Sequence, residues 1–182
     1  MFILYAVVAG LAIALALGGR PGGLARLQFR LAPLAVLGFL LQLVLFSGPV
    51  SDRVGALGAP LYVASTGLVF AVLLVNARIV GLPIVALGAA ANLAAIVANG
   101  GYMPASAAAL VAAGKLPAVG YSNSAVLANP QLAPLTDIFA LPTWLPFHNV
   151  FSIGDLLIGL GIAVAIVAAM RATDPSPDTS PG

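Results

Sequence analysis

Two carboxylates in the C-terminal third of the chain are the residues best placed to do chemistry. Asp137 lies in Leu135-Thr-Asp-Ile-Phe139, and Asp155 lies in Phe151-Ser-Ile-Gly-Asp155. Two carboxylates that share one proton can activate a water molecule and protonate a leaving group, because like charges at short range push their pKa values apart. If the fold brings the two acids together, the sequence predicts an aspartyl hydrolase.

Each carboxylate also has a structural interpretation. Ser152 and Asp155 have the spacing of a capping box, in which a Ser precedes the helix and an acid stands at its third residue. The same acid would lie at the positive end of the helix dipole. Asp137 could likewise begin a short surface turn. The residue types therefore leave two roles open for these acids, catalysis and the start of a helix.

Few other polar residues could support such a site. His148 is the only His and the chain has no Cys, so no zinc or haem ligand set can be proposed and we expect no metal or cofactor. Asn92 and Asn99 are spaced so that they share one helix face with Gly88 and Ala95. They would either bond across helices or line a polar cleft, and we favour helix packing.

The elements that must position these residues are strongly apolar. The sequence is 62% hydrophobic and only 7% charged, whereas a soluble domain carries about 25% charged residues. So few charges could not keep the surface in water, which makes the lipid bilayer the expected surroundings. The basic residues form no patch with interleaved aromatics, so nucleic-acid binding is not predicted.

Five apolar runs approach the length of about 17–25 residues that a helix needs to span a bilayer. They cover residues 2–19, 31–46, 59–75, 79–98 and 153–170. We therefore predict an all-α, polytopic integral membrane protein with five transmembrane helices in one domain, residues 1–172. Between helices four and five, residues 100–149 would form a structured lid outside the cytoplasm, with a short helix capped by Ser106. The polar, Pro-rich tail 173–182 should be disordered.

The arginines predict how the chain is oriented. Cytoplasmic loops of membrane proteins are enriched in Lys and Arg. If the chain crosses five times, five of the seven basic residues fall on one side: Arg20, Arg26, Arg30, Arg78 and Arg171. Arg53 and Lys115 fall on the other. We therefore expect the N-terminus outside the cell and the C-terminus in the cytoplasm.

The two acidic stretches resemble the C-terminal part of bacterial lipoprotein signal peptidases. These membrane aspartyl proteases carry one catalytic Asp in a hydrophobic-Asp-Phe setting and a second in a Phe-Asn-x-Ala-Asp setting that opens the last transmembrane helix. The resemblance implies that Asp137 and Asp155 form the catalytic pair. In this chain Ser152 and Gly154 replace that Asn and Ala, and no Gly-Asn-x-x-Asp-Arg motif precedes Asp137.

Most of the chain more closely resembles an uncharacterised family of small bacterial membrane proteins. The features that carry this resemblance are Ala98-Asn-Gly-Gly101 with Met103-Pro104, an Asp-Ile-Phe segment, and Phe-Ser-Ile-Gly-Asp at the last span. It implies a bacterial cytoplasmic (inner) membrane location and brings no known activity.

We favour a non-enzymatic role, as a subunit or assembly component of a larger membrane complex. Its partners would be the lipid bilayer and other membrane-protein subunits, reached through small-residue helix faces such as Gly159/Ala163 and Gly161/Ala165. A hydrolase is the first alternative, with Asp137 and Asp155 as catalytic residues and polar support from Ser152, His148, Asn92 and Asn99. A small-solute or proton carrier is the second, although such carriers usually need ionisable groups deep in the bilayer.

Overall fold

The computed structural model describes residues 2–115 and 124–172, and this part of the chain is mostly helical. The five long helices are α1 (Phe2–Ala16), α2 (Ala32–Leu45), α4 (Gly58–Val75), α5 (Leu82–Ala98) and α7 (Ile153–Arg171). Shorter helical segments are η1 (Pro21–Arg26), α3 (Gly48–Ser51), η2 (Gly55–Leu57), α6 (Ala107–Ala112) and η3 (Ala133–Leu135). The predicted helical class is confirmed, while the predicted tail 173–182 lies outside the described residues.

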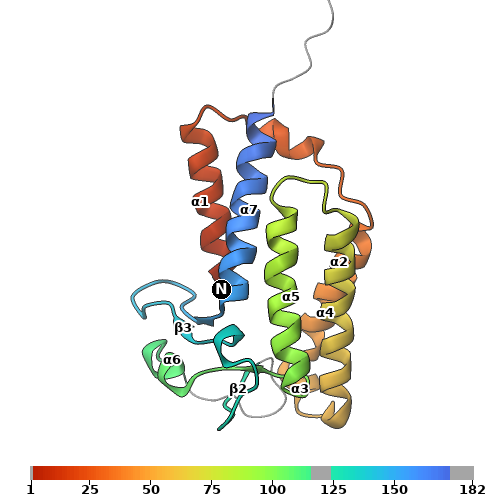
Figure 1. Ribbon diagram of the computed structural model, residues 1–182, viewed down its shortest axis with the longest axis vertical. Helices are drawn as coiled ribbons and strands as arrows, with labels where there is room; N and C mark the ends of the chain where they lie inside the picture. Colours follow the sequence, from red (N-terminus) through yellow and green to blue (C-terminus); the bar gives the residue numbers. More distant parts are fainter. Residues whose placement is uncertain (1, 116–123, 173–182) are drawn as a thin grey trace, which may run out of the picture.

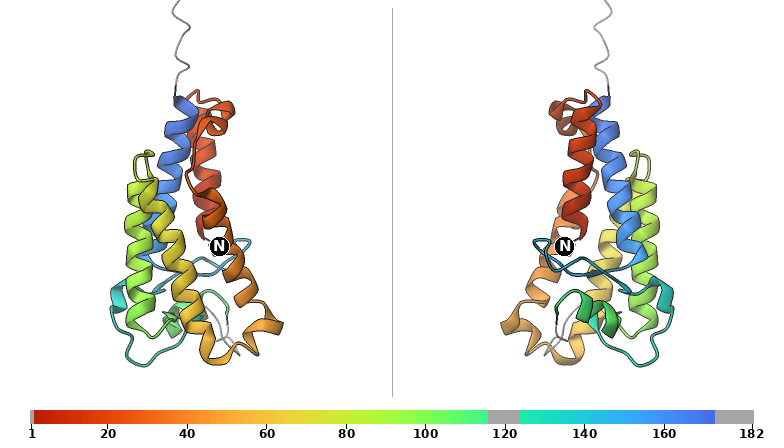
Figure 2. Two further views of the ribbon diagram at one scale, coloured as in Figure 1. Left: turned by 90° about the vertical axis from the view of Figure 1, so that its right-hand side faces the viewer. Right: turned by 90° about the vertical axis from the view of Figure 1, so that its left-hand side faces the viewer.

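The long helices stand side by side, and their direction alternates from one helix to the next along the sequence (Figure 1). Helix α7 packs between α1 and α5, and α4 packs between α5 and α2. The side views show α2 on the side of α4 that faces away from α5 (Figure 2). Helices α1 and α2 are therefore neighbours in sequence but lie at opposite ends of the series α1, α7, α5, α4, α2.

Two helical stretches are long and apolar enough to cross a membrane, Gly55–Val75 with 21 residues and Ile153–Arg171 with 19. The other three long helices are apolar but have 15, 14 and 17 residues. Two of them are shorter than predicted because of glycine. Helix α1 ends before Gly18, which has a φ of 77°, and α5 begins only after Gly81, which has a φ of 91°. Positive φ is a conformation that glycine adopts without strain.

Helix α7 approaches its two neighbours so closely that only small residues fit. A Cβ atom added to Gly161 would lie 2.6 Å from both the carbonyl oxygen of Gly81 and the amide nitrogen of Val85 on the α5 side. On the α1 side, a Cβ atom at Gly10 would lie 2.9 Å from the Cα atom of Ala163. The small-residue faces predicted on α7 are therefore occupied by α5 and α1 of the same chain.

The segment between α5 and α7, which we call the lid, gathers at the end of the bundle where α1 begins (Figure 1). Its described residues, 99–115 and 124–152, contain four two-residue strands that the sequence analysis did not predict. Strand β1 (Met103–Pro104) pairs in parallel with β2 (Ser124–Ala125), and β3 (Phe139–Ala140) pairs antiparallel with β4 (Val150–Phe151). The Phe151 ring stacks on Phe139 and on Phe2, with centroids 5.4 and 4.7 Å apart, and so ties the lid to α1.

Candidate functional site

Three of the predicted site residues meet where α7 begins beside α5. The Asn92 side chain donates its amide N–H to Asp155 Oδ1 at 2.9 Å, and the Ser152 hydroxyl donates to Asn92 Oδ1 at 2.8 Å. The capping box closes this network. Asp155 Oδ2 accepts from the Ser152 amide at 3.1 Å, and the Asp155 amide donates to Ser152 Oγ at 3.0 Å. The capping-box interpretation of Ser152 and Asp155 is therefore confirmed.

Glycines allow Asn92 to reach this position. A Cβ atom added to Gly154 would overlap Asn92 Oδ1, and one added to Gly88 would overlap the carbonyl oxygen of Gly154. The glycine at 154 departs from the signal-peptidase pattern, which has Ala there. In this chain the space that an Ala methyl group would fill is occupied by the Asn92 side chain, so the departure has a structural reason.

The hydrogen-bond directions limit the chemistry that these groups can do. Ser152 is fully buried, and its hydroxyl proton is given to an amide oxygen, which is not a base that could activate the oxygen as a nucleophile. Both carboxylate oxygens of Asp155 accept hydrogen bonds from Asn92 and Ser152. The arrangement joins α5 to α7 and satisfies buried polar atoms, as an interior requires.

Asp137 lies in the lid and is 7% exposed. Its backbone amide donates to the carbonyl oxygen of Pro104 at 2.9 Å, and its own carbonyl oxygen accepts from the Ser106 amide at 3.0 Å. The backbone therefore anchors Asp137 to the chain that leaves α5, whereas Asp155 is held by α5 itself. Each of the two acids predicted to act as a pair is thus positioned by a different part of the structure.

His148 makes a hydrogen bond within the lid, and Asn99 makes hydrogen bonds that join the lid to α5. The Nδ1 atom of His148 lies 3.2 Å from the carbonyl oxygen of Leu145, so this nitrogen is the donor because a carbonyl oxygen only accepts. The Asn99 side chain donates to the carbonyl oxygen of Gln131 at 2.9 Å and accepts from the Gln131 amide at 2.8 Å. Asn99 ends α5, and it therefore fastens the lid to that helix.

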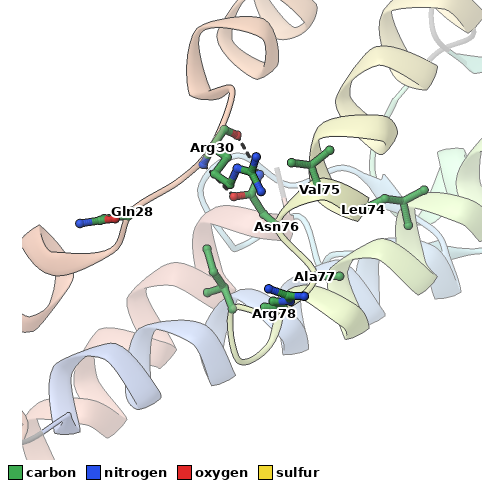
Figure 3. A pocket seen from close by; sticks show the side chains of 8 residues that line it. Gln28, Arg30, Leu74, Val75, Asn76, Ala77 and Arg78 are labelled. Carbon is green, nitrogen blue, oxygen red and sulfur yellow. Dashed lines mark hydrogen bonds between the residues drawn. The ribbon is translucent and has the colours of Figure 1, made fainter.

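Asn76 also bonds the N–H and C=O groups of one distant residue, Arg30, at the opposite end of the bundle (Figure 3). We call such a pair of hydrogen bonds an asparagine clamp. The sequence analysis did not predict this clamp. This buried residue ends α4, and its side chain accepts from the Arg30 amide at 2.7 Å and donates to the Arg30 carbonyl oxygen at 2.8 Å. The amide also donates to the carbonyl oxygen of Val72 at 2.8 Å, just as that of Asn99 donates to Ala95 at 2.7 Å. The sequence signal was an Asn directly after each of the apolar runs 59–75 and 79–98.

The clamp borders a hollow of about 490 Å³ that opens beside the turn between α4 and α5. Arg30 and Arg78 contribute side chains to its lining, together with Gln28 and Asn76 (Figure 3). In the part of the chain that the structure describes, no three His, Cys, Asp or Glu side chains gather into a group that could hold a metal ion.

Comparisons with curated proteins and with solved structures find no match for this chain. A family model does match, that of a family of unknown function (DUF5317), over residues 26–167. The matched region contains both asparagine clamps, the lid and the junction of Asn92, Ser152 and Asp155. The chain therefore belongs to the DUF5317 family, as its resemblance to an uncharacterised family predicts.

Proposed function

We propose that this protein crosses the membrane five times and serves as a non-catalytic component of a larger membrane assembly. The observation that carries the proposal is the large apolar surface of the long helices. On α2, Phe39 is 54% exposed, Leu43 is 70% exposed and Val44 is 57% exposed. Soluble monomers rarely expose contiguous apolar patches larger than a few hundred Å², whereas such side chains are stable in lipid.

Five crossings are consistent with the lengths and directions of the helices. At about 1.5 Å per residue, a helix of roughly 14 residues spans about 21 Å, less than the hydrocarbon thickness of about 30 Å. A short helix is accommodated by local thinning of the bilayer or by flanking side chains that reach the interface. The alternating directions bring the lid to one end of the bundle and the connections 17–31 and 76–81 to the other, which supports one membrane face for each (Figure 1).

The arginines support a cytoplasmic position for the end opposite the lid. Arg20, Arg26, Arg30, Arg78 and Arg171 all lie in or next to the connections at that end. Positive residues are retained on the cytoplasmic side during insertion. We therefore place the lid outside the cytoplasm, in the inner membrane of a bacterium, with the N-terminus on the same side as the lid.

The polar junction favours a structural role over the two alternatives. The Asp155 carboxylate accepts one hydrogen bond from Asn92 of α5 and one from the start of its own helix, and these two contacts account for its presence without a catalytic role. Backbone contact between Gly161 and Gly81 leaves little space between α5 and α7, and a carrier would need a path there past Asn92.

Helix α2 is the surface that we assign to a partner. Among the long helices it packs chiefly on α4, with Gly38 close to Val69, and its outward side chains Phe39, Leu43 and Val44 remain exposed. The small-residue faces of α7 are filled by α1 and α5, whereas α2 has more exposed large hydrophobic side chains than any other long helix of the described residues.

Position-specific photo-crosslinking in native membranes tests this proposal. A photoreactive amino acid at Phe39 should give a discrete protein–protein product. The same group at Val8 of α1, which is 58% exposed, is the matched control and should give only lipid adducts. Identical products at both positions, together with a solubilised chain that migrates as a monomer, would contradict the proposed role in an assembly.

A further inference from the structure

Three arginines are among the residues that line a second hollow, at the end of the bundle opposite the lid. It measures about 760 Å³ and is lined by Arg20, which follows α1, by Arg26 of η1, and by Arg171 at the end of α7. Backbone contacts hold the segments that carry these arginines next to each other. Gly23 of η1 packs directly on the carbonyl group of Ala169, and the Arg20 amide donates to the carbonyl oxygen of Met170 at 2.7 Å.

An apolar groove adjoins this hollow along α1 and α7. It measures about 370 Å³, and its walls are almost entirely hydrocarbon. Arg171 lines both the groove and the hollow, so the two spaces lie next to each other at that residue. The other residues that line the groove are Ile13, Leu160, Ala163, Val164, Val167 and Ala168.

We propose that the groove and the hollow together bind one anionic phospholipid. Its phosphate would contact the guanidinium groups, which form charge-assisted hydrogen bonds to phosphate oxygens, and an acyl chain would follow the groove between α1 and α7. The inference rests on the membrane placement proposed above. The inference goes beyond that placement because most lipid-facing helix surfaces do not select one lipid headgroup over another, whereas this site would.

The charge distribution favours an anionic over a zwitterionic headgroup. The acids of the described residues are Asp52, Asp137 and Asp155, and they belong to α3, to the lid and to the start of α7, all toward the other end of the bundle (Figure 1). A headgroup with an ammonium group would bring a further positive charge to a hollow that three arginines line. Basic pockets between helices on the cytoplasmic side bind anionic headgroups in this way.

The helix ends do not need these arginines as caps. Backbone amides already bond the last carbonyl groups, since Leu17 donates to Ile13 at 3.0 Å, Gly19 to Ala14 at 2.8 Å and Ala172 to Ala168 at 3.0 Å. Capping of the last carbonyl groups therefore does not by itself account for these arginines, whose position at this end also agrees with the positive-inside rule.

Native mass spectrometry of the delipidated full chain in micelles tests this site. The apparent Kd is measured for dioleoyl phosphatidylglycerol, for dioleoyl phosphatidylcholine, and for glycerophosphoglycerol, which has the same headgroup without acyl chains. Three variants are compared with the natural chain. They are the double change Arg20→Gln with Arg171→Gln, the control Arg78→Gln at the same end but in the other hollow, and Ala168→Trp, which fills the groove.

We expect phosphatidylglycerol to bind at least about 10-fold more tightly than phosphatidylcholine. The double change should remove that preference, Arg78→Gln should change the Kd by less than about 2-fold, and Ala168→Trp should weaken only the lipids that have acyl chains. If the double variant fails to fold, Arg20→Gln and Arg171→Gln are tested singly, and each should reduce the preference.

Equal Kd values for the two lipids, or an equal effect of Arg78→Gln, would overturn the site. Tight binding of glycerophosphoglycerol alone would show a soluble phosphate ligand instead. The assay uses the isolated chain and needs no partner protein. A negative result in this assay is therefore distinct from a negative crosslinking result at α2. If the proposed membrane placement is wrong, the chain will stay in solution without detergent during purification, before the assay begins.

Discussion

At the residue scale, three asparagines hold this structure together by the same chemistry. An amide side chain has a donor and an acceptor, so it can bond the N–H and C=O groups of one distant residue at the same time. Asn76 does so with Arg30 and Asn99 with Gln131. Asn92 instead accepts from Ser152 and donates to Asp155. Each asparagine thereby joins two parts of the chain that are distant in sequence.

Replacing Asp155 by Asn should destabilise the fold, because the new side chain has one acceptor where the carboxylate has two. Its NH2 group would face either the Asn92 amide or the Ser152 N–H, both of which are donors. We expect a loss of about 1–3 kcal/mol in the free energy of unfolding. Thermal unfolding in detergent measures it, with Asp52→Asn at an exposed position as the control. An unchanged melting temperature in Asp155→Asn would argue against the structural role.

The sequence revealed only part of this junction. The spacing of Ser152 and Asp155 predicts the capping box because all of its atoms lie within one helical turn. Asn92 is sixty residues earlier in the chain, and only the close approach of α5 and α7 at Gly88 and Gly154 shows that it completes the network. Asn76 ends an apolar run, a position that by itself indicates no partner, so its clamp on Arg30 could not be read from the sequence.

At the scale of elements, the backbone contact between α5 and α7 should make Gly161 intolerant of even one methyl group. The added Cβ atom would lie 2.6 Å from backbone atoms of α5, which cannot shift as a flexible side chain can. Overpacking of this kind costs about 1–3 kcal/mol. Gly67 is the matched control, because a Cβ atom at this position in α4 meets nothing within 4 Å. Unfolding temperatures should fall for Gly161→Ala and not for Gly67→Ala; equal values would contradict the close packing.

The two asparagine clamps should act independently on the connections that they hold. Asn76→Ala removes both hydrogen bonds to the Arg30 backbone, so amide hydrogen exchange at Arg30 should become faster while exchange at Gln131 stays unchanged. Asn99→Ala should give the converse result, because its bonds go to Gln131. Exchange rates rise when a local hydrogen bond is lost. Faster exchange at both residues in either variant would show that the clamps are not local.

Most of the helical architecture could be predicted because apolar runs and their punctuation are local signals. The run 153–170 corresponds to α7, Ile153–Arg171, and the run 59–75 to α4, Gly58–Val75. The strands of the lid could not be predicted, because each has two residues and is defined only by its partner, as with Phe139 opposite Phe151. Helix lengths were overestimated where glycines adopt positive φ, which composition does not reveal.

At the scale of the whole molecule, a lid and an arginine-rich end define two different faces of the bundle. The lid is fastened to α5 by Asn99, to α7 by the antiparallel pair β3–β4, and to α1 by the stacked ring of Phe2. The other end is fastened by Asn76 and by η1 on α7. These attachments give the molecule two distinct ends, and the orientation that we propose for it combines them with the positive-inside rule.

Cysteine labelling in intact cells measures that orientation most directly, because the chain has no natural Cys. Val111→Cys lies in the lid, where Val111 is 78% exposed, and Ala25→Cys lies in η1 at the arginine-rich end. A membrane-impermeant maleimide should label Val111→Cys in cells whose inner membrane is intact, and Ala25→Cys only after that membrane is opened. Labelling of both positions in intact cells, or the reverse pattern, would contradict a five-span protein whose lid lies outside the cytoplasm.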